Sequence, residues 1–266
     1  MSAPSLVLGV DMGATLAKLA FHGESLHTEH FPSGELEAVR ARIAQLSPRR
    51  IVATGGGAEG LGAAIGGVRI EHVPEFDAWS RGAPLVAAEE GIALPSRYLV
   101  VSVGTGTSVL AMSETGAVRV GGTGLGGGTI LGLGRLLLGA GTFTEIASLA
   151  SRGQRRSVDL VVSDIYRGPS PLPGDLTASN FAKLGSTEPQ DLAHALVGLV
   201  GENVALVSAG LARLAGADVV LYAGSTLSDN PALRGVLERT TTLAGLTARF
   251  LVRGAYCGAV GAAFGE

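Results

Sequence analysis

A short apolar segment, a turn of glycine and threonine, and a returning segment occur together twice, and this unit constrains the fold most. Residues 6–10 lead into Asp11-Met-Gly-Ala-Thr15, and residues 98–103 lead into Gly104-Thr-Gly-Thr-Ser108. The chain returns at residues 16–21 and 109–112. Apolar runs of this length, bounded by turn residues, are typical of buried strands. We therefore expect a β-hairpin at the start of each half of an α/β protein, with two related lobes around a cleft.

The remaining pattern alternates between the two kinds of element. Further strands are expected at residues 26–31, 50–54, 68–73, 117–120, 219–222 and 248–252. Helices are expected at residues 35–46, 58–65, 75–90, 130–138, 143–152, 190–214, 231–238 and 256–264. The pattern restarts after Pro95. We therefore predict one lobe at residues 1–96 and a second at residues 97–266.

Composition and charge exclude several classes of protein. The chain has 266 residues, of which 46% are hydrophobic, so it can bury a sizeable core and is not disordered. Its net charge of -3 gives no excess of basic residues of the kind that nucleic-acid-binding proteins use. The longest uncharged run, residues 98–113, is shorter than the ~18 apolar residues of a membrane span. With no signal peptide and one cysteine, Cys257, the chain is expected to be cytoplasmic, without disulfides or a cysteine-based zinc site.

Three glycine-rich turns with threonine or serine favour a phosphate-binding cleft. The third, residues 121–129, opens onto a predicted helix, whose N-terminus attracts anions. Glycine lets the backbone approach a ligand closely, Lys18 adds a point charge, and Asp11 can hold a hydrated Mg²⁺. Each turn alone could be an ordinary hairpin turn, but the three together predict a nucleoside triphosphate site. The chain has neither the P-loop motif nor a strand–GxGxxG–helix opening.

Motifs along nearly the whole chain resemble one family, the type II pantothenate kinases, and within it the short bacterial, staphylococcal-type members. They occur in the family's order: Asp11-x-Gly-x-Thr-x-x-Lys18, Thr54-Gly-Gly-Gly-Ala58, Glu75-Phe-Asp-Ala78, Val103-Gly-Thr-Gly-Thr-Ser108, Arg119-Val-Gly-Gly122, Gly174-Asp-Leu-Thr-Ala178, Gly224-Ser225 and Gly254-Ala-Tyr256. The resemblance implies two ribonuclease-H-like lobes of the actin-like ATPase superfamily, with ATP in the cleft between them. It also implies ATP-dependent phosphorylation of pantothenate, the first step of coenzyme A biosynthesis.

The resemblance also implies roles for individual residues. Glu75 aligns with the catalytic base, and Arg119 aligns with an arginine that supports the substrate and the transferring phosphoryl group. Residues that match the family's nucleotide site are Asp11, Met12, Gly13, Ala14, Thr15, Leu16, Ala17, Lys18, Thr105, Gly127, Gly128, Thr129, Ile130, Leu131, Phe143 and Ser225. Family members are homodimers, so the second lobe is expected to carry dimerisation elements, and residues 174–181 are expected to reach toward the partner's pantothenate.

Two other functions stay open. A kinase for a small sugar or amino sugar would have the same fold, but such enzymes often use an aspartate as base where this chain has Glu75. A non-catalytic ATP-binding regulator is expected to lack the base, the arginine or the lysine, and Glu75, Arg119 and Lys18 are all present. Trp79, one turn after Glu75, is expected to pack in the core, or else to form a wall of the substrate site.

Overall fold

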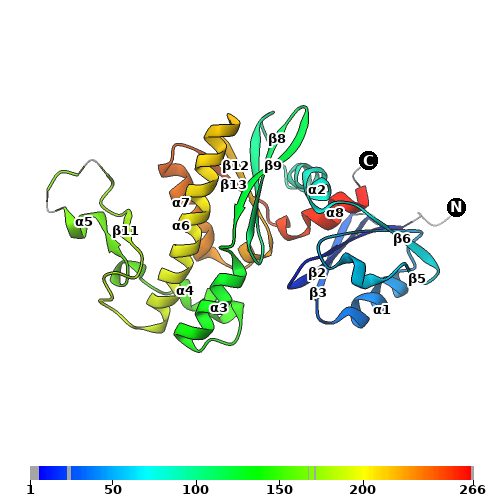
Figure 1. Ribbon diagram of the computed structural model, residues 1–266, viewed down its shortest axis with the longest axis horizontal. Coiled ribbons are helices and arrows are strands. Elements are labelled where there is room, and N and C mark those ends of the chain that lie inside the picture. The colour runs from blue at the N-terminus through cyan, green and yellow to red at the C-terminus, as the bar shows by residue number, and fades with distance from the viewer. Residues whose placement is uncertain (1–5, 23–24, 167, 171, 265–266) are drawn as a thin grey trace.

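The computed structural model describes residues 6–22, 25–166, 168–170 and 172–264. These form two large mixed sheets with helices on and between them, and a separate two-stranded sheet (Figure 1). The first sheet has the strand order β3-β2-β1-β4-β6-β5. Its strands are β1 (Val7–Met12), β2 (Leu16–His22), β3 (Leu26–Pro32), β4 (Arg50–Thr54), β5 (Ala64–Ile65) and β6 (Val68–His72). β1 runs antiparallel to β2 and parallel to β4, so it lies in the middle of the sheet.

Alternation along β1 determines what covers each face of this sheet. Leu8 and Val10 face the helix α1 (Leu36–Leu46) and belong to a buried cluster with Val39 and Ile43. Gly9 faces the other way, directly against the backbone of the last helix, α8 (Cys257–Phe264). A side chain at residue 9 would overlap the carbonyl oxygen of Ala259, so only glycine permits this close packing.

The second sheet has the order β13-β12-β7-β8-β9. Its strands are β7 (Tyr98–Val103), β8 (Thr107–Ser113), β9 (Gly116–Thr123), β12 (Val219–Ala223) and β13 (Thr247–Phe250). One face packs against α3 (Gly127–Leu138), α4 (Phe143–Ala150), α6 (Pro189–Ala215) and α7 (Pro231–Leu243). The other face packs against α2 (Glu75–Glu89) and α8.

α2 and α8 therefore form a layer between the two sheets (Figure 1). They cross through small residues: a side chain at Gly82 would overlap the carbonyl oxygen of Cys257, and one at Gly261 would overlap that of Ala78. Close backbone contact of this kind fixes the two helices against each other, and with them the two sheets.

The longest helix, α6, has the composition of a membrane span but the environment of a core helix. Its most apolar window has a mean hydropathy of 1.7, and 67% of that window is buried inside the protein. Beyond its N-terminal end the chain forms short elements: η2 (Arg155–Ser157), β10 (Leu160–Val161), α5 (Val162–Ile165) and β11 (Thr177–Ser179). This part lies at the end of the molecule away from the first sheet (Figure 1).

The structure confirms both predicted hairpins, and each is the first part of a three-stranded antiparallel meander, β1-β2-β3 and β7-β8-β9. The predicted helix at residues 58–65 is wrong. Residues Ala58–Leu61 form one 3-10 turn, η1, and β5 follows. Gly62 has a φ of 76°, which ends the turn and is incompatible with a continuing helix. The lobe boundary at residue 96 stays a prediction.

Candidate active site

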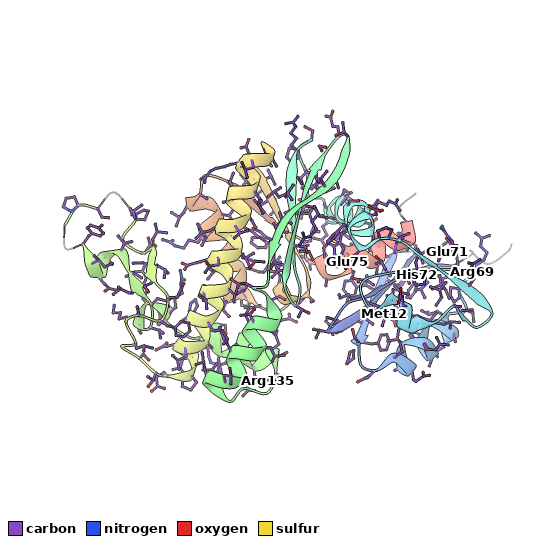
Figure 2. All side chains as sticks on the ribbon, viewed as in Figure 1. Met12, Arg69, Glu71, His72, Glu75 and Arg135 are labelled. Carbon is purple, nitrogen blue, oxygen red and sulfur yellow. The ribbon has the colours of Figure 1, made fainter. Side chains whose placement is uncertain are left out.

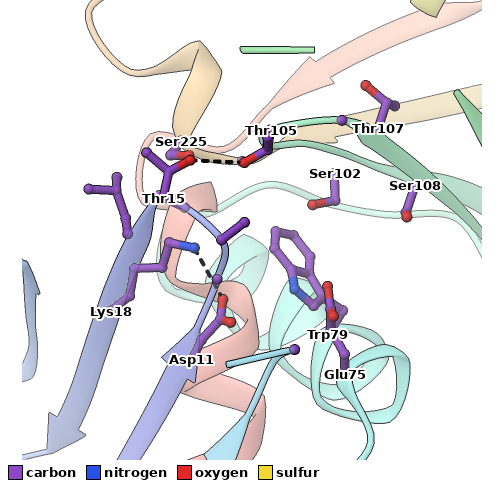
Figure 3. Close-up of a pocket in the computed structure, with 18 of the residues that line it drawn as sticks. Asp11, Thr15, Lys18, Glu75, Trp79, Ser102, Thr105, Thr107, Ser108 and Ser225 are labelled. Atoms are coloured by element: carbon purple, nitrogen blue, oxygen red, sulfur yellow. Dashed lines mark hydrogen bonds and ion pairs between the residues drawn. The ribbon is translucent and has the colours of Figure 1, made fainter. Parts of the chain in front are cut away.

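The two glycine-rich hairpin turns face each other across a cleft. The hydroxyl oxygens Oγ1 of Thr15 and Thr105 lie 3.0 Å apart, which joins the β1–β2 turn to the β7–β8 turn (Figure 3). Two pockets of ≈ 460 and ≈ 370 Å³ share Thr15, Leu16, Lys18, Gly104, Thr105, Ser225 and Ala255. Because they share these residues, they are two ends of one cleft between the sheets.

A buried carboxylate and a lysine form the floor of the cleft. Asp11 and Lys18 are directly opposed in the β1–β2 pairing, and the Lys18 Nζ lies 3.4 Å from the Asp11 Oδ2 (Figure 3). Burial raises the pKa of Asp11, and the positive charge of Lys18 partly opposes that shift. Ala14, within the turn, has no left-handed φ, so this turn does not need glycine there.

The third glycine-rich stretch is hydrogen-bonded to the second turn. The backbone N–H of Gly127 donates to Gly104 at 2.8 Å, and that of Gly128 donates to Thr105 at 2.9 Å. The Thr226 hydroxyl also donates to the carbonyl oxygen of Gly104, at 2.8 Å. Both Gly127 and Gly128 line the cleft, but these two amides are occupied by protein oxygens and hold the turn in place.

Glu75 and Arg119 lie at one end of the cleft. Glu75 is the first residue of α2, after Pro74, and Figure 2 labels it nearer to the second sheet than Met12, the last residue of β1. The guanidinium of Arg119, on β9, stacks over the ring of Phe76 with 5.3 Å between its carbon and the ring centroid. Loss of hydration in the cleft raises the pKa of Glu75, and the negative charge of Asp11 raises it further. A third pocket, of ≈ 540 Å³, also borders Glu75 and shares Gly56 with the first.

The other end of the cleft is more apolar. Gly127, Gly128, Leu131, Phe143 and Ser225 line it, and their role in nucleotide binding stays a prediction. His30 and Tyr256 line the same end.

Four of the residues matched to the nucleotide site do not line the cleft. The side chains of Met12 and Ala17 are buried in the core of the first sheet, and Ile130 is buried in the core of the second. The Thr129 hydroxyl donates to the carbonyl oxygen of Gly124 at 3.1 Å. The other matched residues all line one or both pockets.

Three further polar side chains line the pocket that contains Glu75: Ser102, Ser108 and Thr123. Ser108 and Thr123 belong to the second and third glycine-rich turns, whereas Ser102 was not predicted. Ser102 and Ser108 are paired across the β7–β8 hairpin and point toward the side on which Glu75 and Trp79 lie (Figure 3). A signal for Ser102 was present in the sequence, because it is the one serine or threonine in the apolar strand β7. Trp79 is only 5% exposed, yet it lines the same pocket. It therefore packs in the core and also forms part of the pocket wall.

Among the described residues, no three His, Cys, Asp or Glu side chains gather into a protein-only metal site. Mg²⁺ in phosphoryl-transfer sites is usually held by one or two carboxylates together with the substrate phosphates. The Asp11 carboxylate, which lines the same pocket as Glu75, supplies oxygen ligands of the type that such a site needs.

Comparison with known proteins identifies relatives along the whole chain. The family model described as Fumble matches residues 87–265. A type II pantothenate kinase of Oceanobacillus iheyensis is 36% identical over 96% of this chain and 97% of the relative. Another, of Bacillus thuringiensis subsp. konkukian, is 35% identical over 96% of this chain and 95% of its own length.

Solved structures show the same fold at low identity. The activator of the 2-hydroxyisocaproyl-CoA dehydratase from Clostridium difficile, solved with ADPNP, has a TM-score of 0.63 and 15% identity, covering 97% of this chain and 92% of its own. A ROK family glucokinase from Streptomyces griseus, solved with glucose and AMPPNP, has a TM-score of 0.52 and 15% identity, covering 97% and 98%. The two lobes thus have the actin-like ATPase fold, and the chain belongs to the type II pantothenate kinases, a family of phosphotransferases.

Proposed function

We propose that this enzyme transfers the terminal phosphoryl group of ATP to the primary hydroxyl of pantothenate, giving 4'-phosphopantothenate for coenzyme A biosynthesis. One observation carries the proposal: Glu75 and Arg119 line the same pocket as Asp11, Lys18 and Thr105. A base and an arginine thus lie beside a phosphate-binding floor. The names of the relatives support pantothenate as the acceptor.

Glu75 is the proposed general base. Its carboxylate would accept the proton of the acceptor hydroxyl as that oxygen attacks the phosphorus atom. A base works best when its pKa is near the working pH, and the raised pKa of Glu75 moves it in that direction. Ser102 and Ser108 lie close enough in the same pocket to bind the acceptor's polar groups.

Arg119 would hold oxygens of the acceptor and of the transferring phosphoryl group. Its guanidinium is already oriented by the ring of Phe76, which limits its movement without using its N–H donors. Since phosphoryl transfer depends mainly on positioning and on charge stabilisation, a fixed arginine at this point is well suited to the reaction.

Lys18 and Asp11 would organise the phosphates. Lys18 places a positive charge in both halves of the cleft, where the β- and γ-phosphates would pass. Asp11 would hold Mg²⁺, which when bound would neutralise charge on the phosphate oxygens. The turns around Gly13 and Gly104 would approach the phosphates with their backbones.

The proposed enzyme is a cytoplasmic homodimer. Two observations support the dimer. Residues 174–181 do not line the cleft of their own chain, and Ala178 and Ser179 are exposed on β11. A segment with family-specific sequence that lies away from its own active site is free to serve a second copy.

The test is a coupled ADP-release assay with Mg·ATP and pantothenate, glucose, glucosamine and no acceptor, with the phosphorylated product identified by mass spectrometry. We expect turnover with pantothenate alone. In Glu75→Gln, kcat should fall ~10²–10⁴-fold while ATP binding persists. Asp77→Asn is the matched control, because Asp77 lies on the same turn of α2 and does not line the pocket. Turnover with a sugar, or ATP binding without turnover, would contradict the proposal and favour a sugar kinase or a regulator.

A further inference from the structure

We propose that His30 contacts the bound nucleotide through Nε2, and that Tyr256 positions its ring from the other lobe. The inference deepens the proposed function, on which it rests for the identity of the nucleotide. It adds a ligand-contacting residue from the first sheet that lies outside all three glycine-rich turns.

The strand register places His30 beside the lysine of the phosphate site. In the β2–β3 pairing His30 is directly opposite Lys18, and Leu16 is opposite Pro32. Directly opposed residues point to the same face, with their Cβ atoms ~5 Å apart. Since Lys18 faces the cleft, His30 faces it as well, and both line the ≈ 370 Å³ pocket.

Tyr256 holds the imidazole from a segment near the C-terminal helix α8. The Nδ1 of His30 lies 3.0 Å from the Tyr256 hydroxyl oxygen, and the ring centroids are 6.4 Å apart. Tyr256 ends η4 (Gly254–Tyr256), directly before α8, so this hydrogen bond joins two segments far apart in the sequence. Burial raises the pKa of Tyr256, so the phenol keeps its proton. In the proposed arrangement the Tyr256 hydroxyl donates to Nδ1, and the ring proton of His30 is then on Nε2.

The bond to Tyr256 uses Nδ1 and leaves Nε2 for a ligand. Engagement of one ring nitrogen fixes both the orientation of the imidazole and the tautomer that the other nitrogen presents. The ring is exposed and takes no part in the core of the first sheet. A fixed, solvent-facing nitrogen beside Lys18 is a suitable donor for an oxygen of a nucleoside triphosphate.

The other residues that line the ≈ 370 Å³ pocket indicate which part of a ligand His30 would meet. Leu131, Phe143 and Ala147 form an apolar surface suited to a base, whereas Ser225, Ser228 and Asp229 supply polar groups. His30 lies on the Lys18 side and lines neither of the pockets that contain Glu75. We therefore assign its contact to the ribose–polyphosphate part of the nucleotide, and not to the acceptor.

Two substitutions separate the ligand contact from the bond to Tyr256. An asparagine amide reaches about as far as Nδ1, so His30→Asn keeps a partner for Tyr256 and loses Nε2. A glutamine amide reaches about as far as Nε2, so His30→Gln keeps the ligand contact. His27→Asn is the control, because His27 is on the same strand, stacks on Phe21 and lines none of the pockets.

The experiment is a calorimetric titration of each variant with AMPPNP and Mg²⁺, followed by separate KM values for ATP and pantothenate. We expect His30→Asn to raise the Kd for AMPPNP ~10-fold, the loss of one charge-assisted hydrogen bond, while His30→Gln and His27→Asn stay within ~2-fold of the parent. Tyr256→Phe should give a smaller rise, and the KM for pantothenate should not change in any of the His30 variants.

An unchanged Kd in His30→Asn would overturn the inference. So would an equal loss in His30→Gln and His30→Asn, because that result would mean that His30 only joins the two lobes. The titration needs no acceptor, so it remains informative even if the parent protein does not phosphorylate pantothenate.

Discussion

Two carboxylates share the reaction end of the cleft, and their proximity affects both catalysis and stability. Glu75 and Asp11 each have a raised pKa, in both cases mainly because hydration is lost. The ionised form of each is therefore less favourable in the folded protein than in the unfolded chain. Strongly perturbed carboxylates of this kind are common at functional sites.

The raised pKa of Glu75 predicts the acidic side of the pH–rate profile. Only the ionised carboxylate can accept the hydroxyl proton, so kcat/KM should fall as the pH drops through a pKa above the ordinary 4.5 of glutamate. The measurement is kcat/KM for pantothenate across pH 5 to 9 at saturating Mg·ATP. The same acidic limb in the residual activity of Glu75→Gln would show that another group titrates.

The same shift predicts that Glu75→Gln stabilises the protein at neutral pH. A raised pKa in the folded state means that the stability linked to Glu75 is fully present below the unfolded pKa and is lost as the pH rises through the folded value. Because Glu75 is exposed and solvent screens its charge, the effect is small, and thermal denaturation should give a slightly higher Tm for Glu75→Gln than for the parent at pH 7. The two should converge near pH 4, and a lower Tm at pH 7 would contradict this account.

At the scale of elements, the crossing of α2 and α8 depends on glycines that leave no room for a side chain. Gly82→Ala would place a Cβ against the backbone carbonyl of Cys257, which cannot move without separating the helices. We expect a loss of ~3 kcal/mol or more in the free energy of unfolding, measured by urea denaturation.

Gly235→Ala is the matched control for that substitution. Gly235 lies in the exposed interior of α7, and a Cβ there meets nothing within 4 Å. It should therefore stabilise the protein by ~0.5–1 kcal/mol, because alanine restricts the unfolded chain. If both substitutions had the same effect, the close helix crossing would not be what determines the cost at Gly82.

At the scale of the whole molecule, a bound nucleotide would touch both lobes and should stabilise them together. AMPPNP with Mg²⁺ at ~100 times its Kd should add ~2.7 kcal/mol and raise Tm by several degrees. AMP at the same concentration lacks the phosphates that would meet the turns at Thr15 and Thr105, so its effect should be smaller. Differential scanning calorimetry measures both, and equal shifts would count against phosphate binding by the two turns.

The sequence predicted most of this architecture, because strand and helix periods are local properties. The prediction of a helix at residues 58–65 was wrong because a glycine sets the backbone conformation there. These residues contain apolar residues at helical spacing, but Gly62 has a positive φ that no helix accommodates. It predicted the residues of the three turns, but it did not show that the Gly127 and Gly128 amides bind the second turn. The pairing of His30 with Tyr256 joins positions far apart in the chain, and no local pattern contains that information.

The packing of α8 against β1 has a consequence for how the protein is made. A ribosome produces β1 well before α8, yet Gly9 packs directly against the backbone of Ala259 and Ala263. Until α8 has emerged, the face of the first sheet that carries Gly9 and Val52 has no partner from that helix. The nascent first sheet must therefore wait for all the elements between β1 and α8, and during synthesis this face would be an apolar surface open to chaperones.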